Sequence, residues 1–210
     1  MAMLDASVRL GHVLSPTSPD LEGIVTPIAS LWLPILLSVI AVFLISSFIH
    51  MASPWHKGDY PKLPNEEAVM DALRPFDLPP GDYMFPRPSS MAEMKSPEFL
   101  ERVNRGPRAI MTVLPNGYAG MSKSLIGWAL FILIVTIIAA HVASAVLPPG
   151  AHSHAVFHTI GLYALAAYAF ALWPLSIWYG RGWKISITST VDGLIYAIAT
   201  GLIFMWLWPR

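Results

Sequence analysis

The sequence predicts an all-α integral membrane protein with four transmembrane helices and a long proline-rich cytoplasmic loop between the first and the second. Three stretches that carry no Lys, Arg or Glu, and only one Asp, are long enough for four crossings of about 20 residues each. Hydrophobic residues make up 55% of the chain and charged residues only 12%, whereas an average soluble domain has about 25% charged residues. Because lipid offers no partner to an unpaired backbone, each crossing should be helical.

The hydropathy pattern gives the order of the segments along the chain. Spans are expected at residues 28–50, 124–147, 156–178 and 186–208. The second and third are separated by Pro148-Pro149-Gly150, a strong turn signal. The chain therefore divides into an N-terminal extracytoplasmic tail (1–27), the first span (28–50), the cytoplasmic loop (51–123) and the region of spans two to four (124–210).

Lys and Arg fall mainly on one side of this map. The loop over 51–123 carries nine of them and the connection over 179–185 carries two, whereas the N-terminal tail and the C-terminus carry one each. The positive-inside rule places the richer side in the cytoplasm. Both termini are then expected outside the cytoplasm.

The loop is expected to contain short elements. Asn65 is expected to cap a helix over about 66–74, with acids at its positive end, and a second helix is expected between Ser96 and Gly106. Extended chain is expected over 78–86 and a strand over 108–114. The loop is too small and proline-rich for a catalytic domain and too apolar for a flexible linker. It either folds back on the cytoplasmic ends of the spans or forms a docking surface for a larger partner.

Four histidines gather towards the outer side of the map. His152, His154 and His158 are candidate metal ligands. His141 and His158 lie on neighbouring spans and are candidate ligands of haem, copper or a chlorophyll-type pigment, since neutral imidazole binds such metals. The alternative is a set of interfacial histidines without a ligand. No carboxylate or thiolate accompanies the group, so no cofactor is expected on balance.

Asp192 is the one acid within a span. An acid at membrane depth is costly and suggests a function. A structural hydrogen bond or ion pair that fixes the fourth helix is the preferred interpretation, with His50, Lys123 or Arg108 as the partner. The alternative is a proton or ion relay, although a single acid without polar companions makes a poor pathway.

The fourth span also carries a stripe of small residues. Gly193, Ala197 and Gly201 are each four positions apart, which lets another helix approach closely. Pro34 and Pro174 are expected to bend the first and third helices near their ends.

Several short stretches are similar to a known group of proteins. They are Ile177–Trp183, Asp192–Ala197, Trp206–Pro209, Leu63–Glu66 and Tyr83–Pro86. Together they resemble a family of small bacterial four-helix inner-membrane proteins, over most of the chain from about residue 30. The resemblance implies the four-span architecture and the bacterial cytoplasmic membrane. It implies no activity, cofactor or catalytic residue.

Composition narrows the functions. Zero net charge gives no reason to expect nucleic acid as a partner, and the absence of Cys excludes disulfides and thiolate metal sites. We expect a non-catalytic accessory subunit of a larger membrane complex of the respiratory, photosynthetic or oxygenase type, with membrane lipids and other integral subunits as partners. A metal-, haem- or pigment-binding protein is the alternative, and a small oligomeric transporter or channel is the next. An enzyme is not expected, because no nucleophile–base set or acid pair is evident.

Overall fold

The computed structural model describes residues 25–117 and 120–210. It is mostly helical and has four helices long and apolar enough to cross a membrane, at Ile28–Ala52, Ser122–Val146, Ser153–Tyr179 and Trp183–Leu207. These four helices confirm the coarse prediction and indicate a multi-pass membrane protein. Most of the predicted tail over 1–27 lies outside the described residues.

The chain forms two compact units. The first joins the chain up to Lys57 to Ser122–Arg210, and the second is Gly58–Met121. We call them the helical bundle and the loop segment. Each is described by itself.

Among its described residues, the helical bundle contains five α-helices and three short 3-10 or π-helical turns. The α-helices are α1 (Trp32–Ser47), α5 (Ser122–Val146), α6 (Ser153–Tyr168), α7 (Trp173–Tyr179) and α8 (Trp183–Leu207). A 3-10 turn, Ile28–Leu31, precedes α1, and a π-helical turn, Phe48–Ala52, follows it. Pro34 lies in the first turn of α1. The N–H groups of a first turn have no partner within the α-helix, so a proline there removes no α-helical hydrogen bond.

The third apolar helix is interrupted where the sequence predicted a bend. A 3-10 turn, Phe170–Leu172, separates α6 from α7, and Pro174 lies in the first turn of α7. Proline has no N–H to donate and its ring crowds the carbonyl four residues earlier, so it kinks or breaks an α-helix at this point. Gly180, with a φ of 69°, ends α7.

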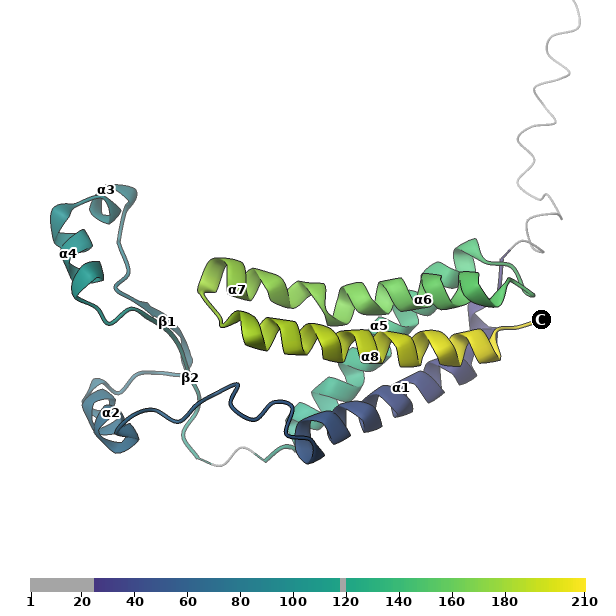
Figure 1. Cartoon of the computed structure of the whole chain (residues 1–210), viewed down its shortest axis with the longest axis horizontal. Helices are drawn as coiled ribbons and strands as arrows, with labels where there is room; N and C mark the ends of the chain where they lie inside the picture. The colour runs from purple at the N-terminus through teal and green to yellow at the C-terminus, as the bar shows by residue number, and fades with distance from the viewer. Residues whose placement is uncertain (1–24, 118–119) are drawn as a thin grey trace, which may run out of the picture. The chain divides into compact units, whose positions relative to one another are not determined.

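Helix contacts define the order around the bundle. α6 and α8 share the most extensive interface, and α1 packs on both α8 and α5, while α5 also packs on α6. Figure 1 shows these four long helices side by side. The ring therefore runs α1, α8, α6, α5.

Two apolar clusters fill the bundle at different heights. One comprises Leu31, Ala139, Ala140, Ala143, Val156, Ile160, Phe204 and Trp208. The other comprises Val42, Ile132, Val135, Ala164, Tyr168, Tyr196 and Ala197. In the first cluster α5 contributes alanines alone, and such small side chains let helices approach closely.

The stripe of small residues on α8 lies against α6. Gly193, Ala197 and Gly201 are all buried. A Cβ atom on Gly193 would lie 2.9 Å from Cβ of Ala169, and one on Gly201 would lie 2.9 Å from the ring of Phe157. Contacts this short are not sterically tolerated, so these glycines determine how closely the two helices pack.

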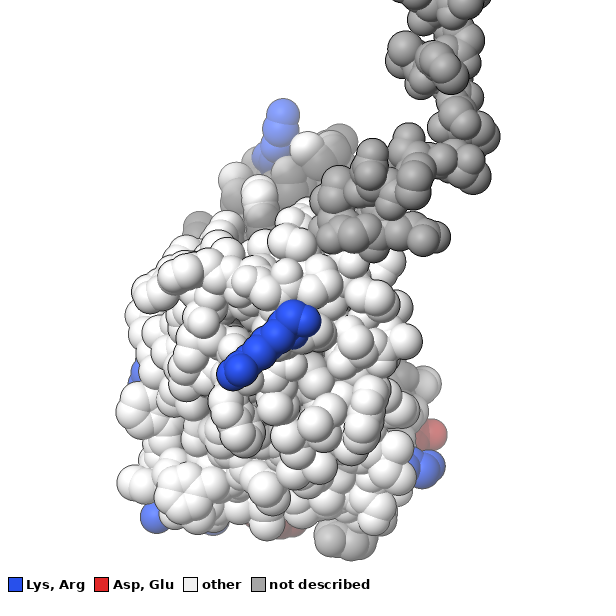
Figure 2. Space-filling view, turned by 90° about the vertical axis from the view of Figure 1, so that its right-hand side faces the viewer, with Lys and Arg blue, Asp and Glu red and all other residues white. Residues whose placement is uncertain are grey.

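One end of the bundle is fastened by hydrogen bonds to backbone carbonyls. Thr26 donates from its hydroxyl to Leu147 (2.8 Å), Trp208 donates from its indole to Pro148 (3.0 Å), and the N–H of Gly150 donates to Pro209 (2.8 Å). Figure 2 looks onto this end, where Lys, Arg, Asp and Glu are sparse. The start of α1, the α5–α6 turn and the C-terminus therefore meet here.

The loop segment contains a hairpin and short helices. β1 (Gly81–Phe85) pairs antiparallel with β2 (Ala109–Val113), with Tyr83 opposite Met111. The helices are α2 (Glu66–Leu73), α3 (Met91–Met94) and α4 (Pro97–Arg105), and a 3-10 turn, Arg74–Phe76, follows α2. The prediction of two helices and two extended stretches holds, but α3 and the pairing of the strands were not predicted.

The helix starts differ in how they are capped. The hydroxyl of Ser96 accepts a hydrogen bond from the N–H of Phe99, and Gly106 ends α4, both as predicted. The prediction that Asn65 caps α2 is wrong. Asn65 has a left-handed backbone (φ 50°, ψ 52°), and its side chain accepts no hydrogen bond from the helix. A capping side chain requires an extended backbone at that residue, which this turn does not provide.

A carboxylate joins α3 to α4 within the loop segment. Glu93 accepts a hydrogen bond from the N–H of Ser89 (2.5 Å) and another from the Arg102 guanidinium (2.8 Å). The bond from Ser89 is the main cause that holds the pKa of Glu93 below its ordinary value, and Arg102 acts in the same direction.

Candidate functional site

A buried acid on α8 and two histidines that follow α1 form the most distinctive polar group of the bundle. Oδ2 of Asp192 lies 2.8 Å from Nε2 of His56, and only 4% of Asp192 is exposed. A carboxylate accepts, so the imidazole N–H of His56 donates in this bond. The pair joins the chain after α1 to α8, and the structural role expected for Asp192 stays a prediction. Its partner, however, is His56 rather than His50, Lys123 or Arg108.

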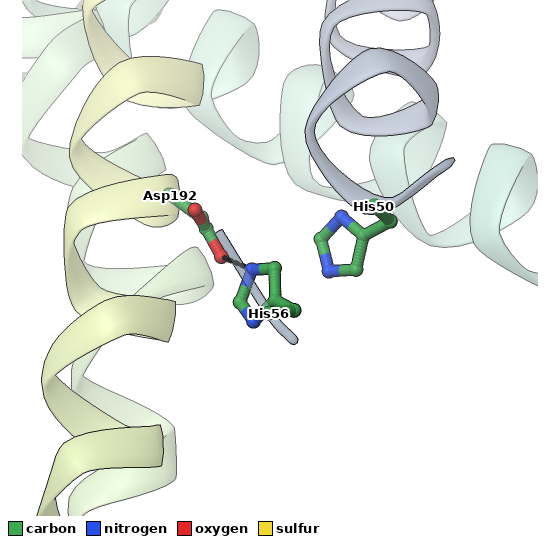
Figure 3. Close-up of side chains that lie close together, drawn as sticks. All are labelled: His50, His56 and Asp192. Carbon is green, nitrogen blue, oxygen red and sulfur yellow. Dashed lines mark hydrogen bonds and ion pairs between the residues drawn. The ribbon is translucent and has the colours of Figure 1, made fainter. Parts of the chain in front are cut away.

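His50 completes the group without touching the acid directly. Its ring stacks on the ring of His56, with centroids 4.4 Å apart and planes at 16°. One ligand atom from each of His50, His56 and Asp192 can be chosen so that all three lie within 4.8 Å of one another. Figure 3 shows the two imidazoles side by side, with His56 between His50 and Asp192.

The backbone explains how residues from two ends of the chain meet. His50 lies in the π-helical turn that ends α1, and Ser53, with an extended backbone, ends that turn. The hydroxyl of Ser53 donates to the carbonyl of Ile49 (2.7 Å), and the N–H of Trp55 donates to this same hydroxyl (3.2 Å). These bonds turn the chain so that His56 meets α8. Wide turns of this kind are frequent at functional sites.

Further polar bonds surround the group in the same part of the bundle. The indole of Trp128 donates to the hydroxyl of Ser46 (2.8 Å), which joins α5 to α1. Tyr196, one turn after Asp192 on α8, packs its ring at 6.0 Å from Trp128 and 5.6 Å from Tyr168. The hydroxyls of Tyr168 and Tyr196 are buried without a hydrogen-bond partner. Asp192 therefore has polar neighbours that its place in the sequence did not reveal.

The outer histidines form a different arrangement. The rings of His152 and His154 lie 5.7 Å apart, and those of His154 and His158 lie 5.9 Å apart. All three are exposed, as is His141 on α5. Nδ1 of His152 accepts a hydrogen bond from the N–H of His154, which caps the start of α6. In the described ranges, 25–117 and 120–210, the three side chains that come within metal-binding reach are His50, His56 and Asp192 and not these.

His56 is the member of this site that sequence reasoning missed. It lies after the end of the first span, where no helical period relates it to Asp192, 136 positions later. Its one signal in the sequence is the pairing of His50 and His56, six residues apart at the end of an apolar span.

The loop segment presents a second functional feature, its exposed apolar side chains. Among its described residues, Phe99 is the single buried one. Tyr60 is 82% exposed, Leu114 72%, Phe76 69% and Met91 68%. A segment that leaves side chains of this size exposed is suited to binding another surface.

Comparison with known proteins assigns the chain to no group. No protein-family model matches it, no curated protein matches its sequence, and no solved structure matches its fold.

Proposed function

We propose that this protein is a non-catalytic accessory subunit of a larger bacterial membrane complex of the respiratory, photosynthetic or oxygenase type. It docks on other integral subunits through its helices and through the loop segment. In this proposal the chain lies in the bacterial cytoplasmic membrane, with the loop segment in the cytoplasm and both termini outside.

The charges of the bundle support this orientation. Lys57, Lys123, Arg181 and Lys184 all lie at the ends of helices on the side where α1 ends and α5 and α8 begin. At the opposite end the described residues carry one basic side chain, Arg210. Basic residues are retained on the cytoplasmic side of a membrane, so the loop segment is assigned to that side.

The observation that carries the docking proposal is the missing core of the loop segment. A two-stranded hairpin is marginal by itself in water. Short helices likewise need a packed apolar face to be stable. Since the described part of the segment buries Phe99 alone, its many exposed apolar side chains need an external surface.

Charge favours a protein surface over a lipid surface for this contact. The loop segment carries nine Asp and Glu against seven Lys and Arg. Anionic lipid attracts segments with an excess of Lys and Arg, at about 1 kcal/mol per basic residue. A segment with a slight acidic excess gains little there, whereas a protein partner with apolar pockets and a few basic side chains matches it.

The test is native mass spectrometry of the particle extracted from the source membrane, with a small tag after Arg210. A short chemical cross-linking step in the membrane precedes extraction, so that a weakly held partner is retained. We expect stoichiometric co-purification of at least one other integral membrane protein. A particle that contains only this chain, as a monomer or a homo-oligomer, would overturn the proposal.

Substitutions then test whether the loop segment makes the contact. Phe76→Asp and Leu114→Asp place a charge on exposed apolar positions, so neither should unfold the chain, but both should release the partner. Asn116→Asp adds the same charge at an exposed polar position and should retain it. Equal retention by all three variants would mean that the partner binds elsewhere on the chain.

A further inference from the structure

The geometry points to a divalent transition-metal site formed by His50, His56 and Asp192. Two imidazoles and one carboxylate bring three ligand atoms within 4.8 Å of one another at the end of α1 and on α8. This site is separate from the outer histidines, and it does not depend on the docking surface of the loop segment.

The hydrogen bond of His50 prepares its ring to act as a ligand. Nδ1 of His50 lies 3.0 Å from the carbonyl oxygen of Ser46. A carbonyl only accepts, so Nδ1 carries the proton and Nε2 presents its lone pair. Histidine ligands of metals usually donate their second ring N–H to a backbone carbonyl or a carboxylate in this way. The bond thus selects the tautomer that a metal needs.

Asp192 provides a charged ligand that is incompletely satisfied. Its Oδ2 accepts from His56, but its Oδ1 is buried and has no hydrogen-bond partner. A buried acceptor without a partner is costly. A metal bound between the carboxylate and the imidazoles would displace the hydrogen now held between Oδ2 and Nε2 of His56, and a neutral His56 would then carry its proton on Nδ1. The positive charge of the same ion would also stabilise Oδ1, the carboxylate oxygen that has no hydrogen-bond donor.

The distances between the ligand atoms are close to those around a bound ion. Ligand atoms on a tetrahedral zinc ion, with bonds of about 2.0–2.1 Å, lie roughly 3.4 Å apart. The observed pair of Oδ2 and Nε2 is 2.8 Å apart, and the longest separation in the group is up to 4.8 Å. The exposed ring of His50 must also turn out of its near-parallel stack on His56, because an imidazole lone pair lies in the plane of its ring and has to point at the shared ion.

The ligand set indicates the class of ion. Two histidines and one carboxylate with no thiolate favour Zn²⁺, Fe²⁺ or a similar ion over Ca²⁺ or Mg²⁺, which prefer oxygen ligands. Three protein ligands leave at least one position for water or another ligand. The side chain of His56 is 17% exposed and that of Asp192 is 5% exposed, whereas His50 is exposed and is the member of the site most open to an ion.

The test uses the full-length protein purified in detergent and treated with a chelator. Co²⁺ serves as the visible probe, because tetrahedral Co²⁺ absorbs strongly in visible light, and Zn²⁺ is then added as a competitor. We expect one Co²⁺ per chain, displaced by Zn²⁺. His50→Gln and Asp192→Asn should each weaken Co²⁺ binding at least about 10-fold. Removing a residue that merely hydrogen-bonds to a metal ligand already lowers metal affinity by about 10–100-fold.

A matched control separates this site from the outer histidines. His154→Gln removes an exposed histidine that contacts His152 and His158, and it should leave Co²⁺ binding unchanged. His50→Gln alters an exposed ring and should leave the fold intact. Monodisperse elution of this variant in gel filtration would show that its loss of Co²⁺ binding is not caused by unfolding. Absence of stoichiometric binding by the unaltered protein would overturn the inference. Equal binding by His50→Gln, or loss of binding in His154→Gln alone, would overturn it as well.

Discussion

Gly193 provides the sharpest test of the bundle, because its missing side chain lets α8 approach the end of α6. A Cβ atom there would lie 2.9 Å from Cβ of Ala169, 3.1 Å from its backbone nitrogen and 3.1 Å from the carbonyl carbon of Tyr168. Carbon atoms pack best at about 3.5–4.0 Å, so Gly193→Ala forces the two helices apart by roughly 0.6 Å. Two of the three contacts are backbone atoms and cannot rotate away.

The magnitude follows from two opposing effects. Forcing extra atoms into a packed interface costs about 1–3 kcal/mol. Replacing Gly by Ala inside a helix returns about 0.5–1 kcal/mol. The net destabilisation therefore lies between about 0 and 2.5 kcal/mol, which lowers the Tm of a chain of this size by up to roughly 10 °C.

The assay is thermal unfolding of the purified protein in detergent, followed by the fluorescence of its eight Trp residues. Gly127→Ala is the matched control, since a Cβ at this position on α5 would have no atom within 4 Å. It should leave the Tm unchanged or raise it by a few degrees. Gly201→Ala should fall between the two, because two of its three close contacts are with the ring of Phe157, which can turn aside.

One result would refute this reasoning. If Gly193→Ala melted at the same temperature as Gly127→Ala, α6 and α8 would not approach as closely as described. The small-residue stripe would then have another role, such as contact with a second copy of the chain.

Three further predictions concern single hydrogen bonds. Asp192→Asn should lower the free energy of unfolding by about 1–3 kcal/mol, seen as a lower Tm, because it weakens a buried hydrogen bond to His56. If the variant kept its stability but lost ion flux in vesicles, the result would support the ion relay instead. Thr26→Val keeps the shape of a buried side chain but removes its bond to the end of α5, and should cost about 1 kcal/mol in the same assay. Because the native pKa of Glu93 is depressed, its stabilising effect is complete above the unfolded pKa and is lost as the pH falls through the native one. Hydrogen exchange at Ser89 should thus be faster in Glu93→Gln than in the unaltered protein near pH 6, and the difference should shrink below about pH 4; a constant difference would contradict this.

Local chemistry made several elements predictable. A stretch of about 20 apolar residues has one stable conformation in lipid, so composition alone located the four long helices. Pro174 disturbs the third helix through its own chemistry, because the missing N–H belongs to proline itself. Ser96 and Gly106 were likewise predictable, because each affects only the helix end at which it lies.

Asn65 shows where such local reasoning ends. Asn is suited both to cap a helix and to adopt a left-handed backbone. In this chain Asn65 adopts the left-handed backbone and its side chain does not cap α2. The pairing of β1 with β2 was equally hidden, since each strand could be recognised but its partner could not.

The sequence by itself predicted the four apolar helices that the described residues contain, with their ends to within a few residues, and it suggested a polar partner for Asp192. Only the tertiary structure decided that the partner is His56, that His50 stacks beside it, and that α6 lies against the glycines of α8. The physical reason is the range of the forces. Hydropathy and backbone preference act within one helix, whereas the position of His56 depends on how α1 and α8 pack and on the turn after α1.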